Sequence, residues 1–117
     1  MDMGNSILKD TRKALGLIED NSEFDSEILM LINSAIVKLN QNGVGNNLTV
    51  ADESATWLDL QDPSQTEGNK NFNLAPLFIA LSAKLIFDPP PPSSVEYHTR
   101  LTDEILWRMK ITYESAQ

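Results

Sequence analysis

The sequence predicts an all-α protein, a small bundle of about four to five helices with a long loop between the second and third main helices. Apolar residues recur at three- and four-residue spacing in three long segments, 24–39, 71–87 and 95–114. Residues that start or stop helices flank these segments. Four consecutive prolines separate the last two segments. At 117 residues, we expect a single domain spanning residues 1–117.

A short helix is predicted over residues 5–16. Five side chains at helical spacing define its face: Ile7, Leu8, Thr11, Ala14 and Leu15. Asn5 or Ser6 is placed to cap the first turn, and Gly16 is placed to end the helix. The basic residues of this segment, Lys9, Arg12 and Lys13, are expected on its solvated face.

The second helix is predicted from Ser22 to Gly43 and is amphipathic over its whole length. Its apolar positions are Phe24, Ile28, Leu31, Ile32, Ala35, Ile36 and Leu39. Ser22 is followed three residues later by Asp25, which is typical of a capping box at a helix start. Asn42 and Gly43 are suited to end the helix, because glycine is the usual residue past the last turn.

Residues 43–70 form a long connection rich in turn-forming residues. Asp52 is placed to cap a brief helix, and the polar segment 62–69 is expected to be a loop. A connection this long is uncommon in a small domain unless it is functional or disordered. Trp57 and Leu58 are therefore expected to pin part of it to the core or to a neighbouring subunit.

The segment 71–87 is apolar almost all the way round, which predicts a helix buried on several sides. Pro76 is tolerated only if this helix begins near Asn73. Burial on several sides is hard to achieve within so short a chain, so we expect other subunits to cover part of the helix. Phe72 and Phe78 are the candidates for such contacts.

The prolines at positions 89–92 predict a stiff elbow before the last helix, residues 95–114. Ser93 or Ser94 is placed to cap that helix. Trp107 lies off the helix's apolar stripe. Core packing is the default for a tryptophan, and a subunit contact is the alternative.

Composition excludes several classes of function. The net charge of −8 argues against general nucleic-acid binding and against anionic membrane surfaces. There is no cysteine, so disulfides and thiolate metal sites are excluded. No apolar run approaches the roughly 20 residues of a membrane span. The N-terminus lacks the pattern of a signal peptide, and we expect the protein to be made and used in a cytoplasm.

No constellation of catalytic residues is visible, so an enzyme is not expected. His98 is the only histidine, and it is expected to be a surface or half-buried side chain. The carboxylates Glu19, Asp20, Glu23 and Asp25 cluster at a predicted helix start, where they complement the helix dipole and lack the spacing of a calcium loop. We expect no metal and no cofactor.

Two segments together resemble a known family. Phe24 to Gly45, with its long amphipathic helix and Asn-Gly end, looks like the second helix of tailed-phage head–tail connector proteins. Leu85 to Ser94, which contains Asp-Pro-Pro-Pro-Pro, resembles the family's last elbow, and the following helix has Leu101, Ile105 and Trp107-Arg108 in the expected order. The resemblance extends over roughly residues 5–113, and it rests on order, spacing and length rather than on one diagnostic motif.

The resemblance implies a structural role without catalytic residues. About a dozen copies of such a protein assemble as a closed ring beneath the portal after DNA packaging. The ring extends the DNA channel and docks the stopper or tail, while DNA passes through without specific binding. The protein would be located at the head–tail junction of the virion, and in the host cytoplasm during assembly. Some members use a longer C-terminal tail toward the portal, and only Ser115-Ala116-Gln117 follows the predicted last helix here.

The alternative is a small acidic helical module, monomeric or dimeric, that binds or regulates one protein partner. Ring formation separates the two interpretations. On the connector interpretation, Trp57, Leu58, Phe72, Phe78 and Trp107 are the candidate subunit or partner interface residues.

Overall fold

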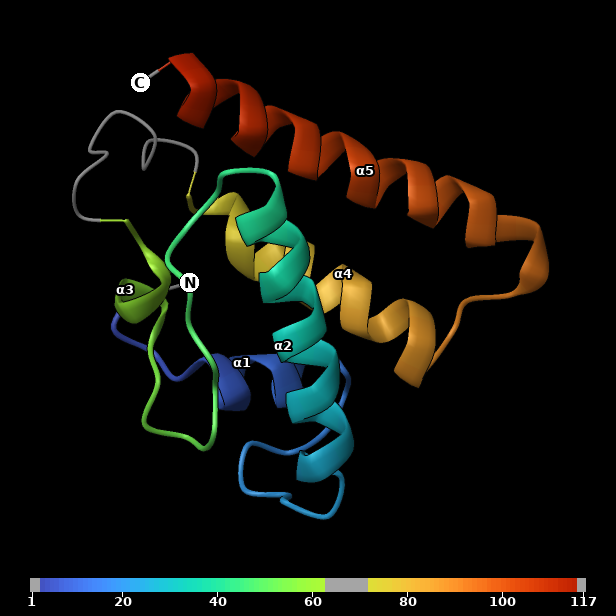
Figure 1. The fold of residues 1–117 in the computed structure, drawn as a ribbon. Coiled ribbons are helices and arrows are strands. Elements are labelled where there is room, and N and C mark those ends of the chain that lie inside the picture. The colour runs from blue at the N-terminus through green and yellow to red at the C-terminus, as the bar shows by residue number, and fades with distance from the viewer. Residues whose placement is uncertain (1–2, 63–71, 116–117) are drawn as a thin grey trace.

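The computed structural model describes residues 3–62 and 72–115. This part of the chain forms five helices and no strand, which confirms the predicted all-α class (Figure 1). The helices are α1 (Ile7–Ala14), α2 (Asp25–Gln41), α3 (Trp57–Leu60), α4 (Leu74–Phe87) and α5 (Pro92–Ser115). In its described residues, 42–62 and 72–73, the long connection between α2 and α4 contains one helix, the one-turn α3.

Helix α1 begins and ends as predicted. The Ser6 Oγ accepts a hydrogen bond from the Lys9 backbone N–H at 3.2 Å, which satisfies one of the free amides of the first turn. Gly16 follows the helix with φ +85°, a conformation that glycine adopts without steric cost. The N-terminal segment then pairs with the distant connection through a single antiparallel bridge between Ser6 and Thr56.

Helix α2 begins at Asp25 with Phe24 as its N-cap, two residues later than predicted, and the expected capping box at Ser22 is wrong. Residues 21–25 form turns instead. The Asn21 side chain accepts from the Glu23 N–H at 3.0 Å, and the Ser22 carbonyl accepts from the Asp25 N–H at 3.2 Å. The carboxylate of Asp25 is bonded to a residue of α1, so it is not available to cap. Gly43, with φ +78°, ends the helix as expected.

Asparagine side chains tie the connection after α2 back onto that helix. The Asn33 amide brackets Val50, donating to its carbonyl at 3.0 Å and accepting from its N–H at 2.7 Å. Asn40 donates to the carbonyls of Val44 and Asn46 at 3.0 and 2.9 Å. Backbone groups without helix or strand partners are satisfied in this way.

Helix α3 is capped by Thr56 rather than by Asp52. The Thr56 N–H donates to the Asp59 carboxylate at 2.9 Å, in a capping box that closes the single turn. Asp52 instead accepts from the Ser54 N–H at 2.8 Å, in a local turn of the kind that aspartate favours. Apart from residue 62, the predicted polar loop 62–69 lies outside the described residues.

Helix α4 is the centre of the core and contacts α1, α2 and α5. It begins after Asn73, so Pro76 lies in its first turn as predicted. The single chain covers more of α4 than the sequence suggested, and its exposed large apolar side chains are Leu77 and Ile86. The largest fully buried apolar side chains are Trp57, Tyr113, Phe72, Phe78, Ile7, Leu8, Ile28, Ile32, Ile36, Leu39 and Leu60.

Helix α5 starts inside the proline run, at Pro92, so the predicted cap at Ser93 or Ser94 is wrong. Proline at the first helical position needs no N–H partner and already has a helical φ, which makes a serine cap unnecessary. Ser94 donates from its N–H and its hydroxyl to the Pro91 carbonyl at 2.9 and 3.1 Å. The stripe that α5 buries consists of Thr102, Ile105, Leu106, Met109 and Tyr113.

Candidate functional site

The five candidate interface residues fall into two groups. Trp57, Phe72 and Phe78 are buried within the single chain, each at most 1% exposed. Leu58 and Trp107 are 56% and 60% exposed. Of the five candidates, only Leu58 and Trp107 are therefore exposed enough to contact a neighbouring subunit.

Trp57 packs in the core of the single chain rather than against a neighbouring subunit, and a polar contact explains how it is buried. Its indole Nε1 donates to the Asp10 Oδ2 at 2.8 Å, between two buried side chains. A buried indole N–H needs such a partner, because leaving it unbonded costs free energy. The bond attaches α3 to α1 across 47 residues of sequence, which pins the long connection to the core.

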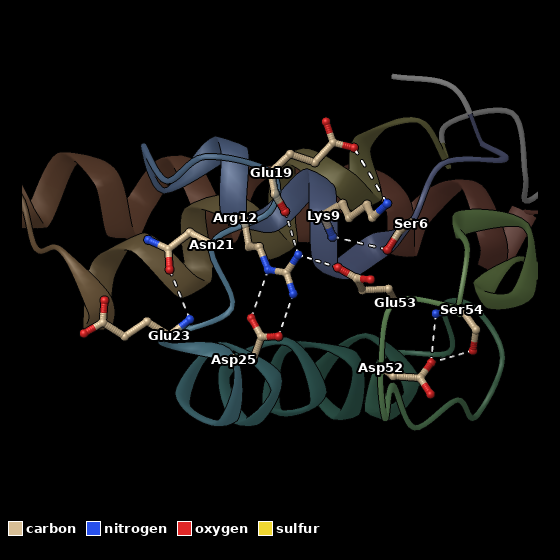
Figure 2. A network of polar contacts seen from close by, with 10 residues as sticks. All are labelled: Ser6, Lys9, Arg12, Glu19, Asn21, Glu23, Asp25, Asp52, Glu53 and Ser54. Atoms are coloured by element: carbon tan, nitrogen blue, oxygen red, sulfur yellow. Dashed lines mark hydrogen bonds and ion pairs between the residues drawn. The ribbon is translucent and has the colours of Figure 1, made fainter.

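Arg12 is the residue that the sequence reasoning misplaced. It was expected on a solvated face, but it is 1% exposed. Its guanidinium binds Asp25 with two bonds, Nε to Oδ1 at 2.9 Å and Nη2 to Oδ2 at 2.5 Å. Nη1 donates to the Glu53 carboxylate and to the Glu19 carbonyl, both at 2.6 Å (Figure 2). One side chain thus joins α1, the turn before α2, the start of α2 and the connection before α3.

The hydrogen bonds of this network keep the Arg12 side chain charged. The side-chain bond to Asp25 is the largest influence and raises the pKa of Arg12 above its ordinary value, and the bond to Glu53 acts in the same direction. Burial opposes both by disfavouring the charged form. Arg12 therefore stays cationic, and the paired carboxylates compensate its desolvation.

A signal for Arg12 was present in the sequence. Position 12 is four residues after Leu8 and three before Leu15, so it lies on the same face of α1 as these buried residues. Sequence spacing could have placed Arg12 on the inner side. It could not name the partners, because Asp25 and Glu53 are 13 and 41 residues away.

The network borders an open pocket of about 820 Å³, lined by Leu8, Arg12, Asp20, Ser22, Asp25, Leu29, Ala51, Asp52, Glu53 and Ser54. The guanidinium uses four of its five N–H groups on three acceptor groups, so little of it is left to bind a ligand in the pocket. Within residues 3–62 and 72–115, no group of three or more His, Asp or Glu side chains is arranged to hold a metal ion. His98 is half-buried and bonds the Ser94 carbonyl at 2.8 Å. The polar side chains bonded to Arg12 at this pocket therefore hold segments of the fold together.

The outward side of α5 exposes several large apolar side chains. Tyr97 and Trp107 are each 60% exposed and Ile111 is 41% exposed. They alternate with exposed charged residues, of which Arg108 pairs with Glu104 at 3.3 Å. This side of α5 is opposite to the helix's own buried stripe, and α5 contacts α4. Exposed tryptophan and tyrosine side chains of this kind are enriched at protein interfaces.

Together these features define a small all-α protein, held by a buried ion network and with exposed aromatic side chains on its last helix. The chain belongs to the phage connector protein family, whose sequence model matches residues 7–116. This confirms the resemblance drawn from the second helix and the proline elbow. No curated protein sequence and no solved structure matches the chain. None of the helices in the described part of the chain combines the length and apolar character that crossing a membrane requires.

Proposed function

We propose that this protein is a head–tail connector, or adaptor, of a tailed phage or prophage. About a dozen copies form a closed ring beneath the portal, extend the DNA channel and dock the stopper or tail. Membership of the phage connector family over residues 7–116 is the observation that carries the proposal. The protein acts at the head–tail junction of the virion and is present in the host cytoplasm during assembly.

The structure supports this role through its surface. Leu58 on α3 and Trp107 on α5 are large apolar side chains left in solvent by an otherwise well-packed core. Exposed aromatic side chains on a rigid helix are typical of the centres of protein interfaces. A ring subunit needs such surfaces, because each copy contacts two neighbours as well as the proteins above and below it.

The net charge of the protein supports a channel through which DNA passes without being bound. A net charge of −8 per copy, repeated round a ring, favours a channel wall that repels phosphate and lets the duplex slide. Replacing lumen-facing carboxylates with lysine should slow genome ejection. An unchanged ejection rate in such phages would contradict this part of the proposal.

The test is assembly in solution and on a portal. Light scattering across a concentration series, with negative-stain images of the largest species, should reveal rings either of the protein alone or after a purified portal ring is added. A protein that remains a monomer or dimer at every concentration and does not bind the portal would overturn the proposal. That result would favour the alternative, a small acidic module that binds one protein partner.

A further inference from the structure

The charge of this protein is divided unevenly along the chain. Residues 14–69 contain ten carboxylates and one basic residue, Lys38, whereas residues 70–117 contain five acidic and five basic residues. The net negative charge therefore belongs to α2 and to the connections on either side of it, and the half that contains α4 and α5 is neutral. Two surfaces of different charge on one chain permit a head-to-tail contact between copies.

The acidic surface lies over the Arg12 network. We use the name acidic pocket for the exposed residues Ile18, Asp20, Asp52 and Glu53, three of which line the pocket of about 820 Å³. Arg12 compensates Glu53, but Asp20 and Asp52 have no cationic partner among residues 3–62 and 72–115. Ile18, in the turn that leads to Asp20, is 77% exposed. This surface thus has uncompensated negative charge at Asp20 and Asp52, and Ile18 is an exposed apolar side chain two residues before Asp20 in the sequence.

The complementary surface is on α5. We use the name α5 stripe for Tyr97, Arg100, Glu104, Trp107 and Ile111, all exposed and spaced by three and four residues. That spacing keeps them on one side of the helix. Arg100 has no ionic partner in the described part of the chain, and it borders a shallow hollow with Tyr97 and Glu104. The acids Glu96, Asp103 and Glu114 lie on the flank of the helix at other positions.

The α5 stripe has the composition and reach of an interface. Tryptophan, tyrosine and arginine are the residues that contribute most binding energy at protein interfaces. A helix of 24 residues is about 36 Å long. The whole molecule measures 40 × 35 × 21 Å, so α5 spans one of its sides.

We propose that the α5 stripe of one copy docks on the acidic pocket of a second copy, with Arg100 against Asp20 and Asp52 and the aromatic side chains against Ile18. In Figure 1, α5 lies at one end of α2, and the connection before α2, to which Ile18 and Asp20 belong, lies at the other end. Each copy can then bind two neighbours through one repeated contact, as a ring of many copies requires. The assignment rests on the proposed connector function, because it names the surfaces through which the ring closes.

Cross-linking tests which surfaces meet. The chain has no cysteine, so an introduced thiol is unique. Ser22→Cys at the pocket and Glu104→Cys on the stripe leave Asp20 and Arg100 in place. Mixing these two variants under oxidation should yield several-fold more disulfide-linked dimer than mixing Glu104→Cys with Gln41→Cys, an exposed position on α2 away from the pocket. Equal yields from the two mixtures would overturn the inference.

A charge exchange tests the energetics. Arg100→Glu should weaken self-association by about tenfold or more, and Asp20→Lys in the same chain should restore most of it. Lys84→Glu, an exposed change of the same charge on α4, is the control and should have little effect. A wild-type protein that does not self-associate either alone or on the portal, or a Lys84→Glu variant weakened as much as Arg100→Glu, would overturn the inference.

Binding and ring assembly on a purified portal distinguish a failure of this inference from a failure of the proposed function. Wild-type protein that fails to bind a purified portal ring argues against the connector role, whatever its self-association. Arg100→Glu protein that still forms complete rings on the portal overturns only the assignment of the α5 stripe to the acidic pocket.

Discussion

Arg12 shows how one buried charge organises three separate segments. Burying a guanidinium is costly, and only a bidentate carboxylate with further hydrogen bonds offsets that cost. Asp25 supplies the bidentate partner, and its own side chain is 25% exposed, while that of Glu53 is 46% exposed. Asp25 is therefore the dominant partner, since an exposed ion pair contributes little.

Asp25→Asn should destabilise the fold by about 2 kcal/mol or more, because it removes the charged partner of a buried cation. Urea unfolding followed by circular dichroism measures the change. The matched control is Asp20→Asn, an exposed carboxylate in the same pocket, which should change stability by no more than about 0.5 kcal/mol. Equal effects of the two substitutions would show that Arg12 does not depend on Asp25.

Tyr113 is a buried residue whose ionisation is coupled to folding. It is buried near the end of α5. Burial, and next the negative charge of Asp62, raise the pKa of Tyr113 to about 12, although backbone hydrogen bonds from Gly45 and Asp62 oppose the shift. The folded state therefore holds the neutral phenol more firmly than the unfolded chain does.

This coupling predicts alkaline destabilisation. The stability that neutral Tyr113 contributes is fully present below its unfolded pKa of about 10 and is lost as the pH rises toward the folded value of about 12. Urea midpoints measured across this interval should fall more steeply for the wild type than for Tyr113→Phe. Tyr97→Phe, at an exposed position, should keep the wild-type profile. Identical profiles for wild type and Tyr113→Phe would refute the coupling.

At the scale of elements, the connection between α2 and α4 is ordered by side chains rather than by its own secondary structure. Residues 43–56 contain no helix or strand, yet Val44 and Val50 are buried. Asn33 and Asn40 on α2 provide the hydrogen bonds that a neighbouring strand would otherwise supply. The connection is thus part of the core, and its position depends on α2.

Asn33→Ala should cost about 2 kcal/mol of folding stability, because it leaves the N–H and the carbonyl of buried Val50 without their partner. Amide exchange in the connection should also accelerate before exchange in α2 does. Asn42→Ala removes an exposed bond to the Lys38 carbonyl and serves as the control, with an expected loss of no more than about 0.5 kcal/mol. A uniform rise in exchange over the whole protein would argue against this local attachment.

The two glycines that follow α2 should differ in their tolerance of alanine. Gly43 and Gly45 both have positive φ, +78° and +76°. A Cβ on Gly43 would meet nothing, so Gly43→Ala should cost only the conformational strain of about 1 kcal/mol. A Cβ on Gly45 would lie 3.0 Å from the Leu60 carbonyl oxygen, so Gly45→Ala should cost clearly more. Thermal unfolding of the two variants checks the order, and equal losses would contradict it.

At the scale of the whole molecule, the charge distribution determines how the protein meets other macromolecules. The segment that contains α2 is strongly acidic, and the basic residues of α5 are interspersed with acids. No basic patch of the kind that neutralises successive phosphates is built by this arrangement. The protein is expected to bind other proteins and to leave DNA free.

Duplex DNA should therefore show no retardation with this protein in a gel-shift experiment, even at low salt where electrostatic binding is strongest. The same preparation should be assayed in parallel for self-association, so that an inactive sample is recognised. Retardation that disappears as salt is added would show a phosphate-binding surface and contradict the proposed passive channel.

Local rules were sufficient for most helices. The ends of α1 and α2 at Gly16 and Gly43, and the start of α4 after Asn73, follow from single residues and their immediate neighbours. Glu104 and Arg108 pair at 3.3 Å for the same reason, because the two residues are one turn apart. The predicted helix starts failed where two local signals competed, as at Ser22 and at the prolines before Ser94.

By itself, the sequence determined the all-α class, the stiff elbow, the acidic character and the family to which the chain belongs, since these depend on composition, local spacing and order along the chain. Only the tertiary structure decided that Arg12 bonds Asp25 and Glu53 and that Trp57 bonds Asp10. Those outcomes depend on contacts between segments 13 to 47 residues apart. The partners of a buried polar side chain are settled when distant segments pack together, and no local pattern contains that information.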